Sequence, residues 1–231
     1  GCCKGKGGSM HMFSKEWGFM GGHGIVGGQA PLALGAAFAI KYEEKNELVV
    51  CLLGDAAMNQ GQVFEAMNMA ATWQLPVLFL IENNQYGMGT DIKRTTSVDS
   101  LTKRALAFDM ENKQVDGMNI INFYEELRPI VKKVREEKTP FLLEAMTYRY
   151  KGHSVSDPAS YRTKEELTDY QEKDPLIQMA EYLKTKKLSS ESELKLWNKE
   201  IKEEIKELEK RAEEAPFSPD SSAWQHVFAS A

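Results

Sequence analysis

The chain has 231 residues, of which 42% are hydrophobic and 27% charged, a composition that suits one large globular domain with a sizeable core. Its 29 basic and 34 acidic residues give a formal charge of -5, which excludes the basic surface typical of nucleic-acid-binding proteins. No apolar run approaches the roughly 20 residues of a membrane-spanning helix.

Three cysteines occur, at positions 2, 3 and 51. Two are adjacent and the third lies inside an apolar run, which favours buried or idle thiols in a reducing compartment over a disulfide framework or a metal cluster. The sequence opens on "GCCKGKGG", a loop-like segment without a methionine. We therefore expect an N-terminally truncated piece, in which a targeting peptide cannot be judged.

The first elements, in chain order, begin with a glycine-rich loop over residues 1–24. Small residues dominate 28–45 and predict a helix that is buried on most faces. A continuous apolar run predicts a strand over 47–55, covered on both faces as in a parallel sheet. Residues 59–74 then predict a helix, and residues 75–84 predict the next buried strand.

The middle of the chain continues this alternation. A short helix is expected within 97–108, and a brief strand and turn at 115–119. Residues 121–138 predict a helix with Pro129 near its first turns, and residues 139–150 predict a third long strand. Strands that alternate with helices indicate an α/β fold built on a doubly wound, mostly parallel sheet.

The character of the sequence changes after Tyr150. Residues 151–167 are polar and contain Gly, Pro and Ser, which predicts a surface loop that is ordered or able to switch. Helices are expected beyond it. We therefore divide the chain into an α/β domain, residues 1–165, and a C-terminal helical extension of the same domain, residues 166–231.

The extension carries two helix-start signals. Asp174 is a predicted N-cap with Pro175 in the first helical position. Ser190 and Glu193 form a predicted capping box at the start of a long amphipathic helix. The apolar stripe of that helix consists of Leu194, Trp197, Ile201, Ile205 and Leu208.

Oxygen-rich side chains follow two of the predicted strands. Asp55 comes directly after one strand, and Asn84 ends the next. Open parallel sheets bind ligands beyond the carboxyl ends of their strands, so the two side chains are expected to lie together. Carboxylate and amide oxygens suit Mg²⁺. The Gly54 turn and the N–H groups of Ala56 and Ala57 predict an anion site beside that metal.

This arrangement resembles a known motif. Gly54-Asp55 with Asn84 at this separation is similar to the thiamine diphosphate-binding motif. The segments "KGKGGSMHM", "GIVGGQAPLALGAA", "ENNQYGMGT" and "YRYKGHSVSDPASYRT" resemble the alpha subunits of pyruvate dehydrogenases, the decarboxylating components of 2-oxo acid dehydrogenase complexes. The similarity covers most of residues 1–165 and implies the thiamine diphosphate-binding fold with C-terminal helices.

The resemblance implies a role for each matching residue. Asp55 and Asn84 would give side-chain ligands to Mg²⁺, and Tyr86 would give its backbone carbonyl. The other residues expected to bind thiamine diphosphate are Gly24, Val26, Gly54, Ala56, Ala57 and His153. The family usually has glycine where Ala56 stands, so the contact there depends on a negative φ at that residue.

The chain has four histidines, at positions 11, 23, 153 and 226. His153 opens the polar loop and matches the family's active-site histidine, which implies proton donation during acyl transfer. His11, His23 and His226 are expected to pack or form hydrogen bonds. Ser154 and Ser160 resemble the phosphorylated serines of mitochondrial members, where a phosphate would repel the cofactor.

The resemblance also implies partners. The family is an α2β2 heterotetramer in which a beta subunit supplies a catalytic Glu, and its product is passed to the lipoyl domain of a dihydrolipoyl acyltransferase. The implied reaction is oxidative decarboxylation of pyruvate, in the cytoplasm of a bacterium or in the mitochondrial matrix or plastid of a eukaryote. Open alternatives are a branched-chain 2-oxo acid or acetoin enzyme, and an inactive subunit that keeps only the interface. A dinucleotide-binding dehydrogenase is disfavoured because no G-x-G-x-x-G follows the first strand.

Overall fold

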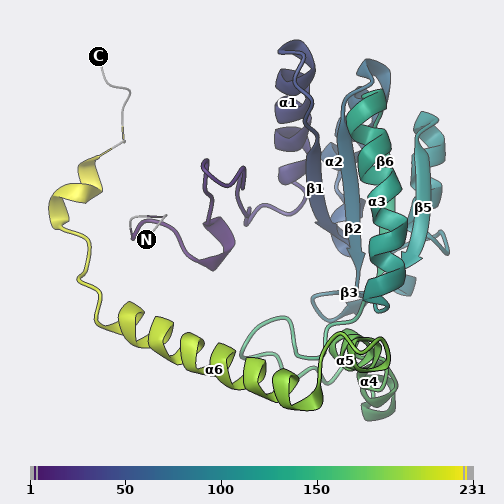
Figure 1. Ribbon diagram of the computed structural model, residues 1–231. Coiled ribbons are helices and arrows are strands. Elements are labelled where there is room, and N and C mark those ends of the chain that lie inside the picture. Colours follow the sequence, from purple (N-terminus) through teal and green to yellow (C-terminus); the bar gives the residue numbers. More distant parts are fainter. Residues whose placement is uncertain (1–2, 4, 226, 228–231) are drawn as a thin grey trace. The chain divides into compact units, whose positions relative to one another are not determined.

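The structure is a computed structural model that describes residue 3, residues 5–225 and residue 227 (Figure 1). Its contacts group the chain into two units, which are described separately. We call Ile25–Glu181 the α/β unit, and Gly1–Gly24 together with Tyr182–Ala231 the terminal unit. The predicted division of the chain at residue 165 stays a prediction.

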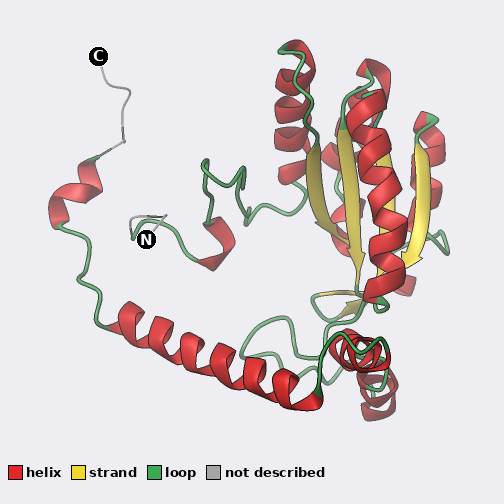
Figure 2. Ribbon diagram, in the orientation of Figure 1, coloured by secondary structure: helices red, strands yellow, loops and turns green. Residues whose placement is uncertain are grey.

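A four-stranded sheet forms the centre of the α/β unit, in the order β1-β2-β6-β5 (Figure 2). Its strands are β1 (Val49–Gly54), β2 (Val77–Asn83), β5 (Glu111–Asp116) and β6 (Phe141–Met146). All three pairings are parallel, so the carboxyl ends of the four strands meet at one edge. A two-stranded antiparallel pair, β3 (Tyr86–Gly87) and β4 (Thr90–Asp91), follows β2.

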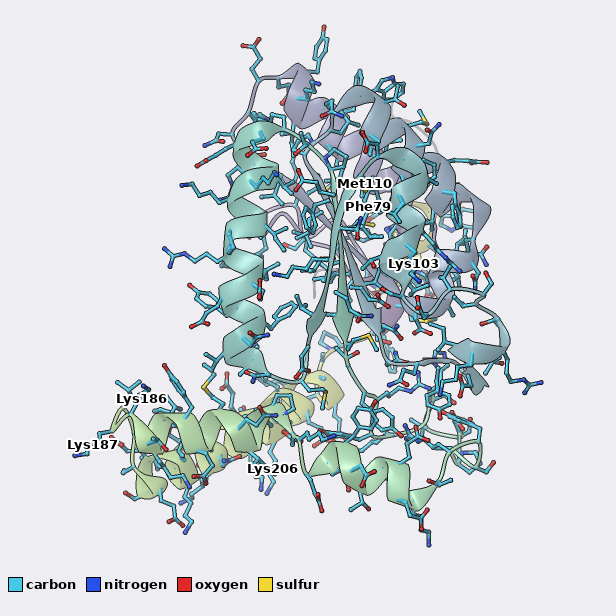
Figure 3. All side chains as sticks on the ribbon, turned by 90° about the vertical axis from the view of Figure 1, so that its right-hand side faces the viewer. Phe79, Lys103, Met110, Lys186, Lys187 and Lys206 are labelled. Carbon is cyan, nitrogen blue, oxygen red and sulfur yellow. The ribbon has the colours of Figure 1, made fainter. Side chains whose placement is uncertain are left out.

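Helices cover both faces of this sheet. The α-helices α1 (Gln29–Tyr42) and α2 (Gly61–Trp73) pack on one face with the 3-10 helix η4 (Leu101–Phe108). Helix α3 (Ile120–Glu137) packs on the opposite face (Figure 2). Phe79 of β2 and Met110 lie in the core of the first layer (Figure 3). The predicted doubly wound α/β fold is confirmed.

Strand β1 departs from the expectation that both its faces are covered. Cys51 and Leu53 are buried, whereas Val50 and Leu52 are 48% and 50% exposed. The strand lies at the edge of the described sheet, and α3 contacts the other three strands instead. The expectation that both faces of this strand are covered was therefore wrong. The run is apolar throughout, but helices of the described chain cover only the face of Cys51 and Leu53.

Three other features differ from those predicted. Pro129 lies in the middle of α3 on its exposed side, and not near its first turns. Strand β5 begins at Glu111, earlier than expected. Its first residues are polar because the strand lies at the sheet edge, so the sequence shows no apolar run there. Residues 164–167, the end of the predicted loop, belong instead to α4 (Lys164–Gln171), which starts where the Thr163 hydroxyl accepts the N–H of Glu166 at 3.1 Å.

Two further helices follow α4. Helix α5 (Pro175–Thr185) starts where Asp174 accepts the N–H of Leu176 at 2.7 Å, which confirms the predicted cap. Helix α6 (Glu191–Glu213) starts with the predicted capping box of Ser190 and Glu193. Within the terminal unit, the ammonium group of Lys6 donates to the backbone carbonyl of Gln225 at 2.8 Å. The short 3-10 helices η1 (Ser9–His11) and η5 (Asp220–Trp224) complete this unit.

Candidate magnesium and diphosphate site

The structure brings Asp55 and Asn84 together at the carboxyl ends of β1 and β2. The parallel register sets Gly54 beside Glu82, so each of the two residues follows directly beyond the paired strands. The backbone N–H of Asn84 lies within hydrogen-bonding reach of the Asp55 carboxylate. The two residues therefore lie together, as the strand order predicts.

The Asp55 carboxylate is buried without a full set of partners. The residue is 2% exposed, and its Oδ2 atom has no hydrogen-bond partner among the described residues. Burial raises the pKa of this carboxyl, although nearby N–H groups and the positive charge of Arg149 oppose the rise. A buried oxygen without a donor is costly unless a ligand satisfies it, so this atom fits a bound cation.

The turn after β2 fixes the Asn84 side chain. The Asn84 side-chain oxygen accepts the N–H of Tyr86 at 3.1 Å, and a carbonyl oxygen retains a second lone pair for a metal. Gln85, between them, has φ of 69°, a left-handed conformation that costs free energy in any residue but glycine. This strain is held at the proposed site by the hydrogen bonds around it.

Tyr86 is fixed at both its backbone and its side chain. It begins β3 and pairs with Asp91 of β4. Its hydroxyl donates to the Glu166 carboxylate of α4 at 2.9 Å, and the hydroxyl of Tyr148 donates to the same group at 2.9 Å. Burial and this carboxylate raise the pKa of Tyr86, and they raise that of Tyr148 to about 12. Both phenols therefore stay protonated as hydrogen-bond donors at neutral pH.

Ala56 adopts a conformation that suits any residue. It lies in the 3-10 helix η2 (Asp55–Asn59), is absent from the described residues with positive φ, and directs its N–H toward the Asp55 carboxylate. The methyl group of Ala56 packs on Gly87, where an added Cβ would stand 2.5 Å from it. Alanine in place of the family's glycine thus brings no backbone strain here. Ala57 is buried in the same turn.

The segment before α1 holds two further predicted residues. The Val26 carbonyl accepts from the Gln62 amide of α2 at 3.1 Å. Gly27 has φ of 80°, and a Cβ there would stand 2.9 Å from Gln60, so only glycine fits. Gly24 belongs to the terminal unit, where its added Cβ would meet the His11 ring at 3.1 Å.

The loop that carries His153 is organised by Asp157. The Asp157 carboxylate accepts the N–H of His153 at 2.7 Å, the N–H of Ala159 at 2.8 Å and the hydroxyl of Tyr161 at 2.9 Å. The N–H of His153 is the main cause that lowers the pKa of Asp157. The His153 side chain is exposed, and no hydrogen bond in the described part of the chain joins it to Asp55 or Asn84.

Two arginines attach this loop to the rest of the α/β unit. Arg149 donates to the Met88 carbonyl at 2.7 Å and to the Tyr161 hydroxyl at 3.1 Å. Arg162 donates to the Tyr150 carbonyl at 2.5 Å and stacks over the Tyr148 ring at 5.2 Å. Arg149, Tyr161 and Arg162 therefore hold this loop by hydrogen bonds.

The remaining predicted residues are placed as follows. Ser154 and Ser160 are exposed in the His153 loop. Cys51 is buried, which raises the pKa of its thiol to about 12. Cys2 and His226 lie outside the described residues.

Sequence reasoning missed a buried polar network behind the site. Glu144 of β6 is 0% exposed and bonds the Asn83 amide at 2.7 Å. The signal was present, since an acidic residue interrupts an otherwise apolar strand, and a buried carboxylate needs partners.

The described residues contain no group of three or more His, Cys, Asp or Glu side chains placed to hold a metal ion. The proposed ligand set uses one carboxylate with amide and backbone oxygens, so it is not of that type. No helix within the described ranges is long and apolar enough to cross a membrane.

The chain is similar to proteins of one family throughout. The family model "Dehydrogenase E1 component" matches residues 1–220. The pyruvate dehydrogenase E1 component subunit alpha of Rickettsia felis is 46% identical over 228 residues, which cover 99% of this chain and 70% of the relative. That of Rhizobium meliloti is 44% identical over 96% of this chain and 64% of the relative.

A eukaryotic relative gives the same result. The somatic mitochondrial form of the subunit from Homo sapiens is 44% identical over 100% of this chain. The chain spans 58% of that relative's length. On these matches and the fold, the chain belongs to the dehydrogenase E1 component family.

Proposed function

We propose that the chain acts as the alpha subunit of a thiamine diphosphate-dependent pyruvate dehydrogenase. The observation that carries the proposal is the buried, unpartnered Asp55 oxygen beside Asn84, at the position that the motif implies for Mg²⁺. The reaction would be the oxidative decarboxylation of pyruvate with reductive acetylation of a lipoyl group. The relatives compared are named for pyruvate, which supports this substrate over branched-chain 2-oxo acids or acetoin.

The residues of the chain would share the work of holding the cofactor. Asp55, Asn84 and the carbonyl of Tyr86 would bind Mg²⁺ and, through it, the diphosphate. The N–H group of Ala57 would face the diphosphate oxygens. The N–H of Ala56 points toward the Asp55 carboxylate, so Ala56 would lie beside the diphosphate without donating to it. When bound, thiamine diphosphate supplies the carbon nucleophile that the decarboxylation requires.

Main-chain groups before α1 would orient the other end of the cofactor. Gly24 and Val26 would contact its pyrimidine through their backbone atoms. The carbonyl of Val26 already accepts a hydrogen bond from Gln62, so α2 positions Val26. Preorganised contacts of this kind lower the entropic cost of binding.

His153 would move a proton during acyl transfer. Its backbone is held by Asp157 while its imidazole is exposed, an arrangement that lets the ring meet an incoming lipoyl group. Phosphate on Ser154, the next residue, would place negative charge near the diphosphate and oppose binding. Ser160 is a second exposed acceptor for the same regulation.

The chain would need a beta subunit. Thiamine chemistry requires a carboxylate that protonates the pyrimidine, and we assign this Glu to the partner in an α2β2 assembly. The product would pass to the lipoyl domain of a dihydrolipoyl acyltransferase. The relatives include bacterial and mitochondrial proteins, so we propose a bacterial cytoplasm or a mitochondrial matrix as the compartment.

The test uses the chain mixed with a beta subunit. Thiamine diphosphate and Mg²⁺ are titrated together, and CO₂ release is measured from pyruvate and from 2-oxoisovalerate. We expect magnesium-dependent binding and release from pyruvate. If thiamine diphosphate does not bind in a magnesium-dependent way, the enzymatic proposal is overturned and the alternative of an inactive subunit is favoured. CO₂ release from 2-oxoisovalerate but not from pyruvate would show that the substrate is a branched-chain 2-oxo acid and not pyruvate.

A further inference from the structure

Behind the proposed metal ligands lies one buried carboxylate, that of Glu144. It accepts four hydrogen bonds. Oε1 accepts from the Asn83 amide at 2.7 Å, and Oε2 accepts from the Ser100 hydroxyl at 2.6 Å, the Leu101 N–H at 3.1 Å and the Gln114 amide at 2.9 Å. All four donors are neutral, and they come from β2, β5 and the start of η4.

The first arm of this network leads to the Asn84 turn. Asn83 donates to Glu144, so its amide oxygen points the other way and accepts the N–H of Gln85 at 3.0 Å. Gln85 is the residue with φ of 69°. The Asn83 side chain therefore holds the strained residue between Asn84 and Tyr86, and Glu144 fixes the orientation of that side chain.

The second arm leads to the Asp55 turn. Glu144 bonds Ser100 and Leu101, where η4 begins. Arg104, one turn further along η4, donates to the Met58 carbonyl and to the Asn59 side chain, the latter at 2.6 Å. Met58 and Asn59 belong to η2, the 3-10 helix that Asp55 begins.

We infer that Glu144 is a positioning residue for the magnesium and diphosphate site, holding the Asp55 turn and the Asn84 turn in register from behind. The inference rests on the proposed function, because it concerns the same metal. Glu144 bonds neither Asp55 nor Asn84 in the described contacts, so its effect passes through Asn83 and through η4. Residues that orient metal ligands typically change metal affinity by about 10–100-fold when altered.

A reciprocal exchange tests the hydrogen-bond pattern. In Glu144→Gln, the new amide group faces one of the four donors, so two donors meet with no acceptor between them. In Asn83→Asp, the new carboxylate faces that of Glu144, so two acceptors meet with no donor between them. In the double variant, the new amide at position 144 would donate to the new carboxylate at position 83, and that carboxylate would still accept the N–H of Gln85. The pattern is restored with the direction of one hydrogen bond reversed.

The measurement is Mn²⁺ affinity by electron paramagnetic resonance, with thiamine diphosphate present, on the full chain assembled with its beta subunit. We expect each single variant to raise the dissociation constant about 10–100-fold and the double variant to return it near the wild-type value. Val134→Ala, a fully buried site in α3, is the control for lost stability alone and is expected to leave the dissociation constant unchanged. If the single variants do not fold, Ser100→Ala, which removes one donor of four, is expected to weaken binding about tenfold.

The outcomes separate the two proposals. If the wild-type assembly binds Mn²⁺ and the folded variants bind it equally well, the role of Glu144 is overturned and the proposed function stands. The role is also overturned if Val134→Ala weakens binding as much as the network variants do. If the wild-type assembly does not bind Mn²⁺ with thiamine diphosphate, both proposals fail.

Discussion

The regions around Asp55 and Glu144 each bury a carboxylate near the same edge of the sheet, yet they treat it in opposite ways. Glu144 receives four hydrogen bonds from neighbouring elements. Asp55 keeps one oxygen without a partner among the described residues. A fully bonded carboxylate holds parts of the fold together, whereas a carboxylate with an unused oxygen is prepared for a ligand. A change at Glu144 should therefore cost more stability than a change at Asp55, whereas a change at Asp55 should cost more binding.

The largest effect on stability is expected from Glu144→Ala. The substitution removes the acceptor of four hydrogen bonds and leaves the Asn83 amide and the Leu101 N–H without another acceptor in the described contacts. Each unsatisfied buried group costs roughly 1–3 kcal/mol, so we expect a loss of about 3 kcal/mol or more. Denaturant unfolding of the metal-free chain measures it. Asp55→Ala is the matched comparison, and an equal loss at both positions would remove the distinction between the two carboxylates.

A smaller loss is expected from Gly87→Ala. The new methyl group would stand 2.5 Å from the Ala56 Cβ, and overpacking of this kind costs about 1–3 kcal/mol. Adding Ala56→Gly removes the clash and should restore most of the stability. Gly61→Ala is the control, since nothing lies within 4 Å of its added Cβ. A double variant as unstable as Gly87→Ala would show that the two turns do not touch.

The pH dependence of stability should distinguish Asp55 in the metal-free chain. Burial raises the pKa of its carboxyl above the ordinary 3.8, so the folded chain holds the proton more tightly than the unfolded chain. Its contribution to stability is therefore present at acid pH and is lost as pH rises through the folded pKa.

The Asp55→Asn variant lacks this loss. Its advantage over the wild type in the free energy of unfolding should grow as pH rises above 3.8 and then level off. The comparison is made in chelator-treated buffer. If the stability of the two proteins changes equally with pH, burial does not destabilise the ionised Asp55 carboxylate, and the prediction is contradicted.

The smallest effect on binding is expected from His153→Ala. The His153 side chain is exposed and not bonded to Asp55 or Asn84 in the described contacts, so cofactor affinity should stay near that of the wild type. Acetylation of a lipoyl domain should slow, by about 100-fold or more if the ring transfers a proton. Unchanged acetylation would leave His153 without a role in catalysis.

Sequence reasoning placed Asp55 and Asn84 correctly because strand ends in a parallel sheet share an edge. It also identified the caps at Asp174 and Ser190, which depend only on local hydrogen bonds. It placed the start of β5 too late, at residue 115 instead of Glu111, and it missed the hydrogen bonds of Glu144, because these depend on residues far apart in the chain. The exposed face of β1 was missed for a related reason, since an apolar run does not tell which helices cover it.

The central claim is that Asp55 is kept for a metal ion that carries the cofactor. Its most direct test is calorimetric titration of thiamine diphosphate, with and without Mg²⁺, into the assembled enzyme containing wild-type chain or Asp55→Ala. We expect magnesium-dependent binding to the wild type and a loss of at least about 100-fold in the variant, the upper end for residues that merely orient metal ligands. Equal, magnesium-dependent binding to both would contradict the central claim.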